Sequence, residues 1–244
     1  MHRCYYPDAP LSGRLTLRGE EAHHALRVMR LRDGDCCEVF DGRGNAAVAR
    51  VLPAHGSCLE LEVQHPLPPL PRVADITLAL AIPKGSHMDL IIQKAVEMGV
   101  SRVIPLVTER TIVRFREGEG AGKADKWRRT ALEACKQCGV NQLPIVEAPQ
   151  PYRAFLRRSD LSSLKLQCAL TEQARPLREL LEQGRNAGEQ AITLLIGPEG
   201  DFSPAEYEQA EQAGFAPASL GPIILRVETA VFVAVASARY ALDT

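Results

Sequence analysis

The chain has 244 residues, of which 45% are apolar and 24% are charged, and its formal net charge is −1. This composition is typical of a folded globular protein and excludes extended disorder. A nearly neutral chain has no overall field that attracts nucleic acid, so any RNA contact must use local basic patches. No apolar run reaches the roughly 18 residues that cross a bilayer, and the first residues lack the apolar segment of a secretory signal. We therefore expect a cytoplasmic protein that has no contact with a membrane.

The seven cysteines follow no regular spacing, which favours reduced thiols over a disulfide framework. Only Cys135 and Cys138 have the CxxC spacing of a metal site, and no second cysteine or histidine pair accompanies them. On a helix these two positions share one face, where small thiol side chains commonly pack in a core. We expect no metal ion.

Short apolar runs separated by turn-forming residues occupy the first part of the chain. They predict a small β-barrel with one helix over residues 20–29. Four prolines in the six residues Pro66–Pro71 then favour a stiff extended connector, because proline fits neither a helix interior nor a central strand. We place a domain boundary there, with the barrel in residues 1–70 and a second domain in residues 71–244. The predicted strands of the barrel are Gly13–Leu17, Cys36–Phe40, Ala46–Leu52 and Cys58–Val63.

Beyond the prolines, apolar runs alternate with segments of helical spacing. This alternation predicts an α/β domain with a mostly parallel sheet and helices on both faces. Gly99 is expected to end the first helix as a C-cap. The last helix is apolar nearly all round, so it must be buried on more than one side, either within the domain or across the interface of a homodimer. The predicted strands are Ile76–Ile82, Val103–Val107, Leu164–Leu170 and Ala191–Ile196, and the predicted helices are Met88–Met98, Lys123–Cys138, Pro204–Ala213 and Glu228–Leu242.

Two loops near the C-terminus, Leu195–Ser203 and Leu220–Ala230, are the most informative segments. Each lies between a strand-like and a helix-like run, which is where α/β proteins place ligand-binding loops. Glycines in the first loop allow a ligand to approach the backbone, and Ser203 with Glu206 has the spacing of a capping box. Ordinary glycine turns are the alternative for either loop alone. Together they indicate one shared pocket.

Several familiar sites are excluded because their motifs are absent. The chain has no GxxxxGK[ST] for a nucleoside triphosphate, no GxGxxG for a dinucleotide, no GxSxG hydrolase elbow and no HExxH metal motif. The pocket therefore requires a ligand that is held mainly by backbone atoms. The polar side chains within reach are those of Glu199, Arg226, Glu228 and Thr229, although Glu228 could also serve only to cap the last helix.

The loops and three further motifs together resemble the bacterial RsmE family, the 16S rRNA (uridine-N3) methyltransferases of the SPOUT superfamily. The resemblance covers essentially the whole chain. It rests on IGPEG at 196–200, LGP at 220–222, ILRVET at 224–229, EACKQCG at 133–139, Lys84-Gly85 with QKAVEMGV at 93–100, and Glu109-Arg110.

The resemblance implies an N-terminal PUA-like β-barrel and a C-terminal α/β domain with a trefoil knot. It also implies a homodimer that binds S-adenosylmethionine in a cleft made by the knotted loops and methylates a specific uridine of 16S rRNA in the small ribosomal subunit. The cofactor contacts carried over by position are Leu170, Thr171, Ile196, Gly197, Glu199, Gly200, Leu220, Gly221, Ile224, Leu225, Arg226 and Thr229.

Methyl transfer from a sulfonium needs neither a metal nor a covalent enzyme intermediate, so positioning and electrostatics must supply the catalysis. Uridine N3 loses a proton, and a fixed guanidinium beside the uracil oxygens would favour the resulting anion. We expect Arg226 to take that role. Glu199 is a candidate catalytic base, with binding of backbone N–H groups as its alternative role.

The expected RNA contacts combine an N-terminal basic cluster with residues of the second domain. Helical spacing places His23, Arg27 and Arg30 on one face, opposite Ala22 and Leu26. A solvated charged face is the alternative for any one of these clusters. The full set of predicted RNA-binding residues is Arg3, His23, His24, Arg27, Arg30, Lys84, Arg110 and Arg114.

The chain departs from the usual family pattern at three positions. Asp201 stands where a third glycine is common, and Ile223 and Val140 stand where arginines are common. Because arginines supply much of RNA affinity, the last two changes affect how tightly the RNA substrate is bound rather than cofactor binding. Two alternatives to the implied activity follow: methylation of a different RNA site, and an RNA-binding ribosome-assembly factor that has lost catalysis.

Overall fold

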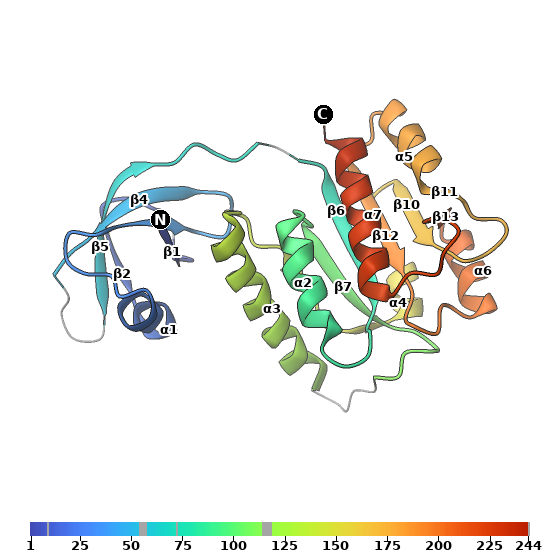
Figure 1. Ribbon diagram of the computed structural model, residues 1–244, viewed down its shortest axis with the longest axis horizontal. Helices are drawn as coiled ribbons and strands as arrows, with labels where there is room; N and C mark the ends of the chain where they lie inside the picture. The colour runs from blue at the N-terminus through green and yellow to red at the C-terminus, as the bar shows by residue number, and fades with distance from the viewer. Residues whose placement is uncertain (9, 54–57, 72, 114–118, 244) are drawn as a thin grey trace. The chain divides into compact units, whose positions relative to one another are not determined.

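The computed structural model describes residues 1–8, 10–53, 58–71, 73–113 and 119–243 (Figure 1). The chain forms two compact units. Unit 1 consists of Met1–Pro71 and Cys135–Leu143, and unit 2 of Arg72–Ala134 and Pro144–Thr244. Unit 1 thus takes in a segment that the sequence analysis places in the second domain.

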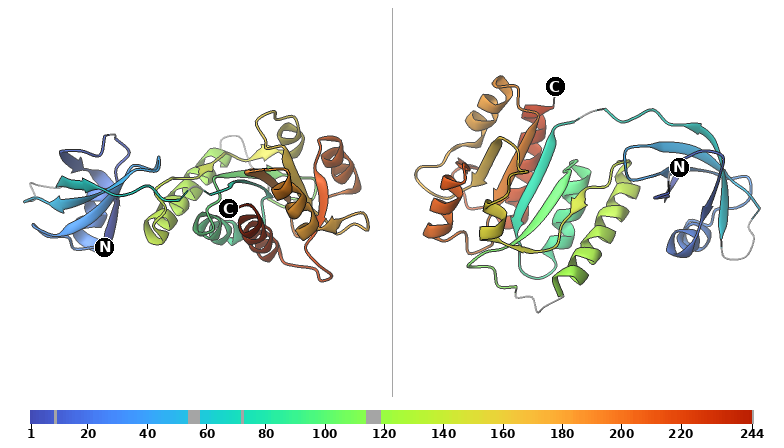
Figure 2. Two further views of the ribbon diagram at one scale, coloured as in Figure 1. Left: turned by 90° about the horizontal axis from the view of Figure 1, so that it is seen from above. Right: turned by 180° about the vertical axis from the view of Figure 1, so that it is seen from behind.

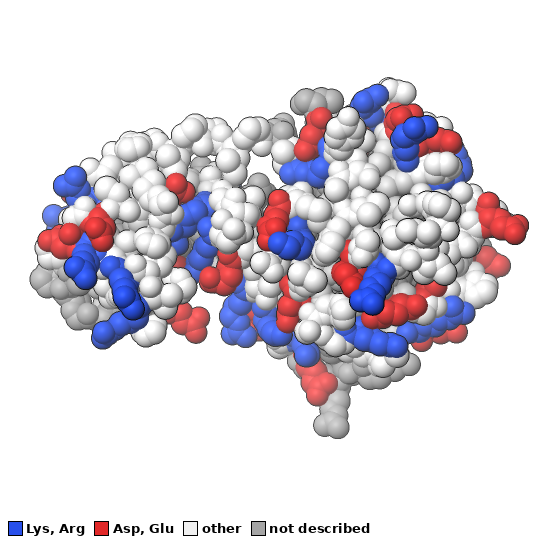
Figure 3. Space-filling model, viewed as in Figure 1, with Lys and Arg blue, Asp and Glu red and all other residues white. Residues whose placement is uncertain are grey.

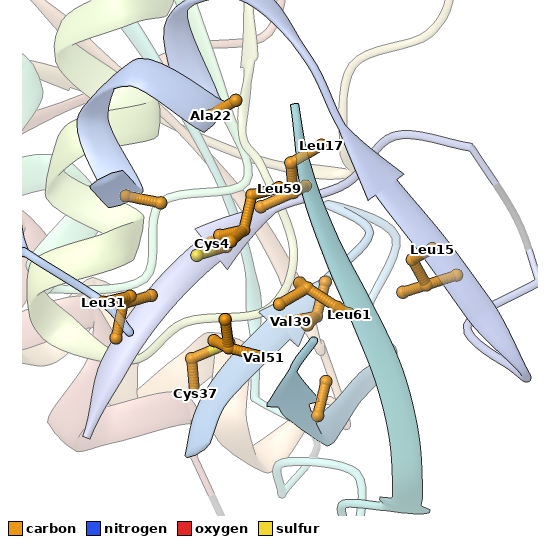
Figure 4. Close-up of a cluster of buried hydrophobic side chains, with 12 residues drawn as sticks. Cys4, Leu15, Leu17, Ala22, Leu31, Cys37, Val39, Val51, Leu59 and Leu61 are labelled. Atoms are coloured by element: carbon orange, nitrogen blue, oxygen red, sulfur yellow. The ribbon is translucent and has the colours of Figure 1, made fainter. Parts of the chain in front are cut away.

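Unit 1 is built on a curled five-stranded sheet with the strand order β1-β3-β4-β5-β2 (Figure 2). The α1 helix is followed directly by a π-helical segment, η1, over the predicted helix, and alternate strand residues such as Leu17, Val39 and Leu61 fill the core (Figure 4). The sequence analysis missed β1, because its four residues show no alternation of apolar and polar side chains. The elements are β1 (His2–Tyr5), β2 (Arg14–Leu17), α1 (Gly19–His23), η1 (His24–Val28), β3 (Cys36–Phe40), β4 (Ala46–Val51) and β5 (Leu59–Pro66).

Arg3 on β1 joins this sheet to the segment 135–143. Its guanidinium donates to the carbonyl oxygen of Cys135 at 2.8 Å and to the side chain of Asn141, and it pairs with Glu38 at 3.1 Å. Only 8% of Arg3 is exposed. The sequence analysis predicts that Arg3 contacts RNA, but its burial and its internal partners assign it to the interior of unit 1 instead.

Unit 2 contains a sheet in which every strand pair is parallel, as predicted from the alternating pattern. The strand order is β11-β13-β10-β12-β6-β7-β8, and β9 also pairs with β7. The strands are β6 (Asp75–Ala81), β7 (Arg102–Val107), β8 (Ile145–Val146), β9 (Gln150–Pro151), β10 (Leu164–Cys168), β11 (Arg175–Pro176), β12 (Ala191–Ile196) and β13 (Ala216–Ser219). The trefoil knot implied by the resemblance stays a prediction.

Helices cover this sheet. The α2, α5 and α7 helices pack together, while α4 and α6 contribute Tyr152, Phe155 and Tyr207 to a separate aromatic cluster with Phe202 and Phe215. The sequence analysis missed α5, although Leu177, Leu180 and Leu181 have helical spacing and are buried. The helices are α2 (His87–Glu97), α3 (Glu119–Cys138), α4 (Tyr152–Leu156), α5 (Leu177–Asn186), α6 (Pro204–Gln212) and α7 (Val227–Leu242).

The predicted helix ends are confirmed at two places that position loops. Gly99 follows α2 with φ +73°, a conformation that glycine adopts without strain. At the start of α6, Ser203 and Glu206 form both bonds of a capping box, from Glu206 N to Ser203 Oγ at 3.4 Å and from Ser203 N to Glu206 Oε2 at 3.0 Å. This capping box holds the C-terminal end of the loop 195–203, one of the two candidate ligand loops.

Candidate functional site

Both predicted loops line one cavity of about 460 Å³ in unit 2. It lies beyond the ends of β10, β12 and β13, at the carboxyl edge of the parallel sheet where ligand sites form in this architecture. The predicted cofactor residues that line it are Leu170, Ile196, Gly197, Glu199, Leu220, Gly221, Ile224, Leu225 and Arg226. Further lining residues include His87, Cys168, Asp201, Ile223 and Glu228.

Three predicted cofactor residues lie beside the cavity rather than on its wall. The carbonyl oxygen of Gly200 accepts a hydrogen bond from Arg110 at 2.7 Å. Thr229 is exposed on the first turn of α7. The hydroxyl of Thr171 is buried and has no hydrogen-bond partner among the described residues, which leaves it available to a ligand at the end of β10.

Two glycines on the cavity wall stand where a side chain would be crowded or the backbone strained. A Cβ atom at Gly197 would lie 3.1 Å from the ring of Phe202 and 3.3 Å from Oδ1 of Asp201. Gly221 has φ +123°, which favours glycine strongly. The backbone is therefore open to a ligand at both loops.

Two glutamates, one in the loop after β12 and one in the first turn of α6, hold neighbouring loops through hydrogen bonds. Glu199 Oε1 accepts from the backbone N–H of Lys84 at 2.9 Å, which fixes the loop after β6. Glu206 Oε1 accepts from the N–H of Glu109 at 2.8 Å and so fixes the loop after β7. Glu199 thus binds a backbone N–H group, the alternative role that the sequence analysis gave it.

Two charged groups face the cavity from the start of α7. Arg226 is the exposed N-cap residue of this helix, and within the described part of the chain its guanidinium has no hydrogen-bond or ion-pair partner. Glu228 lies two residues further on, with Oε2 3.6 Å from Nδ1 of His87. Sequence reasoning missed His87, whose signal was its position directly after the Lys84-Gly85 loop at the start of α2.

The cavity holds one thiol, that of Cys168 at the end of β10. Burial raises its pKa to about 12, so the thiol stays protonated at neutral pH. A protonated thiol is a poor nucleophile. The site therefore favours chemistry that needs no covalent enzyme intermediate.

The three departures from the family pattern have different surroundings. Asp201 has φ +61°, which explains why glycine suits this position. Ile223 is 69% exposed and lines the cavity, where it offers an apolar side chain. The carbonyl oxygen of Val140 lies 3.5 Å from Nη1 of Arg3 in unit 1.

The predicted RNA-binding residues are spread over both units. His23, Arg27 and Arg30 are exposed on unit 1, while Ala22 is buried. Arg30 lies beyond the end of η1 with φ +57°, so helical spacing places only His23 and Arg27. His24 is half-buried on the same segment. Lys84 and Arg110 are exposed in loops of unit 2, and Arg114 lies outside the described residues. In the view of Figure 3, Lys and Arg side chains are interspersed with Asp and Glu, as the small net charge requires.

No group of three or more His, Cys, Asp or Glu side chains is placed to hold a metal ion in the described ranges. None of the helices that the structure describes is long and apolar enough to cross a membrane.

Comparisons with known proteins agree with this architecture. Residues 69–239 match the family model of an RNA methyltransferase domain, and residues 17–62 match that of an RNA methyltransferase PUA domain. Fold and site thus define an RNA methyltransferase of the SPOUT type.

Relatives narrow this class further. The chain is 35% identical over 243 residues to ribosomal RNA small subunit methyltransferase E of Synechocystis sp., covering 98% of this chain and 77% of that protein. The crystal structure of ribosomal RNA small subunit methyltransferase E from Neisseria gonorrhoeae bound to S-adenosylmethionine is 32% identical, with a TM-score of 0.88 and coverage of 100% and 98%. A Legionella pneumophila methyltransferase with bound S-adenosylmethionine is also 32% identical, with a TM-score of 0.89 and coverage of 98% and 97%. The chain belongs to the ribosomal RNA small subunit methyltransferase E family.

Proposed function

We propose that this protein transfers a methyl group from S-adenosylmethionine to N3 of one uridine of 16S rRNA in the small ribosomal subunit, uridine 1498 by the family's naming. The observation that supports this most directly is the cavity between the two predicted loops, in a chain of the same fold as two relatives that hold S-adenosylmethionine. The enzyme would act in the cytoplasm, with the ribosomal RNA.

The residues around the cavity fit this cofactor. Leu170, Leu220 and Leu225 supply apolar surface for a planar base, and the open backbone at Gly197 and Gly221 supplies hydrogen-bonding groups. The unpartnered Thr171 hydroxyl and the carboxylates on the wall add polar contacts. When bound, S-adenosylmethionine supplies an electrophilic methyl group on a cationic sulfur.

Arg226 supplies the charge that the target base needs. A uracil ring that loses the N3 proton spreads negative charge over its two oxygens. A guanidinium is planar, permanently charged and able to donate two parallel hydrogen bonds, so it stabilises this anion better than an ammonium does. The Arg226 guanidinium has no hydrogen-bond partner among the described residues, so its donors are available to the substrate.

His87 is our candidate for the group that accepts the N3 proton. Glu228 beside Nδ1 would orient the ring, which leaves Nε2 as the acceptor. Glu199, the candidate from the sequence, already uses Oε1 to hold the backbone of Lys84. We therefore propose His87 as the base, Glu228 as the group that orients it, and Glu199 as a group that positions the loop.

Residues 1–70 are proposed as the RNA-binding domain and residues 71–244 as the catalytic domain of a homodimer. His23, Arg27 and Arg30 form an exposed basic face on the former. On the latter, α7 leaves Val233 37% exposed and Tyr240 92% exposed, an apolar face that a second copy would cover.

Labelled methyl transfer tests the proposal. Small ribosomal subunits that lack modification would be incubated with the protein and methyl-labelled S-adenosylmethionine, and the modified nucleotide would be mapped. Label on uridine N3 of 16S rRNA is expected. Label on another base or RNA supports a different substrate of the same enzyme class. No transfer by folded protein that binds the cofactor supports the assembly-factor alternative.

A further inference from the structure

Asp201, in the loop between β12 and α6, has a backbone conformation that is rare for residues with a side chain. Its φ is +61°, and among the described residues other than glycine only Arg30 shares a positive φ. A short polar side chain can offset the strain with a local hydrogen bond. Asp201 does so, because its Oδ1 accepts from the N–H of Phe202 at 2.8 Å.

The hydroxyl of Tyr207, on α6, connects this carboxylate to another loop. It lies 2.8 Å from Oδ1 and 2.9 Å from Oδ2 of Asp201, to which it donates, and it accepts from the backbone N–H of Leu170 at 3.4 Å. Tyr207 is 9% exposed. Burial and the hydrogen bond to Asp201 raise the pKa of Tyr207, so the phenol keeps the proton that it donates.

The two residues that Tyr207 joins line the cavity from different strands. Leu170 follows β10 and Asp201 follows β12, and these strands are neighbours in the sheet. The side chain of Leu170 is 61% exposed, so little packing holds its loop. Asp201 Oδ1 also stands 3.3 Å from a Cβ position at Gly197, on the same wall.

We propose that Asp201 and Tyr207 are positioning residues that hold the loops after β10 and β12 at the spacing that S-adenosylmethionine requires. The inference rests on the proposed function only for the place of the cofactor. Loops that are fixed before binding lose less conformational entropy when the ligand arrives, so the link raises affinity without touching the reacting atoms. An aspartate at this position, with a tyrosine partner, would join the two loops by hydrogen bonds, which a glycine has no side chain to make.

Removal of the Tyr207 hydroxyl tests the link. The Tyr207→Phe variant of the full chain is titrated with S-adenosylmethionine by isothermal calorimetry, and thermal unfolding is recorded in parallel. We expect the Kd to rise about tenfold, the loss of one hydrogen bond to a charged group. In steady state the KM for the cofactor should rise while kcat at saturation stays near that of the wild type.

Tyr152→Phe is the matched control. Tyr152 is 3% exposed, belongs to the same aromatic cluster, and donates its hydroxyl to the backbone oxygen of Glu206 at 2.8 Å. Its removal costs a buried hydrogen bond to α6 but leaves the hydrogen bonds that join Asp201, Tyr207 and Leu170 in place. Tyr152→Phe should therefore lower the melting temperature but leave the Kd unchanged.

Variants of Asp201 separate positioning from charge. Asp201→Asn keeps an oxygen that accepts from Tyr207, so cofactor affinity should stay within about threefold of the wild type if positioning is the role. Asp201→Gly removes the acceptor but relieves the backbone strain. The double variant that combines Asp201→Gly with Tyr207→Phe should have the same Kd as Tyr207→Phe alone, because both changes break the same hydrogen bond.

Three results would overturn the proposal: an unchanged Kd in Tyr207→Phe, equal changes in Tyr207→Phe and Tyr152→Phe, or additive effects of Asp201→Gly and Tyr207→Phe. A large loss in Asp201→Asn would also contradict it, since the carboxylate charge would then be what binds. Leu225→Arg places a bulky cation on the cavity wall and tests the site itself. Weaker binding in Leu225→Arg with an unchanged Kd in Tyr207→Phe leaves the site in place and rejects only the link, whereas an unchanged Kd in both variants rejects both.

Discussion

Nδ1 of His87, at the start of α2, lies 3.6 Å from Oε2 of Glu228, in the first turn of α7. The pair faces the same cavity as Glu199, Asp201 and Arg226. If His87 accepts the substrate proton, His87→Asn should lower kcat about 10²-fold at neutral pH. The loss should shrink as the pH rises, because hydroxide then removes the proton. The check is a pH–rate profile of both proteins at saturating cofactor.

Glu228→Gln should lower kcat less than His87→Asn does, since the imidazole stays but loses the carboxylate that orients it. His65→Asn, a change at an exposed histidine on β5, is the control and should leave the profile unchanged. A loss in His87→Asn that stays constant from acid to alkaline pH would show that His87 only shapes the cavity.

Arg226→Lys should lower kcat by about 10²-fold while the Kd for S-adenosylmethionine stays nearly constant. Lysine keeps the charge but loses the planar pair of donors that suits two uracil oxygens. Single-turnover methylation and calorimetry separate these two quantities. Arg178→Lys on α5, an exposed arginine in a helical ion pair, is the matched control. Unchanged turnover in Arg226→Lys would contradict the role.

Neutralising Arg27 and Arg30 should weaken RNA binding with little effect on cofactor binding. Each lost phosphate contact lowers the slope of log affinity against log salt by about one, so the double change to glutamine should lower it by up to about two. Filter binding of a 16S rRNA fragment at several salt concentrations measures the slope. Arg178→Gln removes another exposed charge and should not change the slope. An unchanged slope in the double variant would remove this face from the RNA interface.

The sequence predicted most of this architecture because its long elements carry periodic patterns. The β12 strand and the capping box at Ser203 follow from local residues alone. Short elements such as β1 and β13 escaped, because two to four residues carry no period and form only through pairing with distant strands.

At the site, the two loops were evident from their glycines, whereas the contacts between loops were not. The hydrogen bond from Lys84 to Glu199 joins residues 115 positions apart, and that from Leu170 to Tyr207 joins residues 37 apart. For Arg3, by contrast, the sequence predicted a surface position that the structure contradicts. Its charge indicated a surface, but the pairing of β1 and the segment 135–143 bury it.

Gly99→Ala should destabilise unit 2 by more than its backbone strain alone. A Cβ atom at Gly99 would overlap the guanidinium of Arg239 on α7, which donates to Ala74 O at 3.2 Å and to Asp243 Oδ1 at 3.3 Å. Displacing it would break these bonds, at about 1 kcal/mol each. Gly188→Ala is the control: it has φ +77° but nothing within 4 Å of its Cβ position. The free energy of unfolding would be measured in urea. Equal decreases in the two variants would show that the Arg239 side chain moves aside at no cost in stability.

The exposed apolar face of α7 gives the last prediction. A charged residue at the centre of a dimer interface is left desolvated and unpaired, which costs several kcal/mol. Val233→Glu combined with Tyr240→Glu should therefore convert a dimer to a monomer in sedimentation analysis. Ile145→Glu on β8, where the side chain is 55% exposed, is the matched control and should leave the association state unchanged. If the Val233 and Tyr240 variant sediments as the wild type does, α7 is covered by no second copy, and its apolar character serves only the packing against α2 and α5.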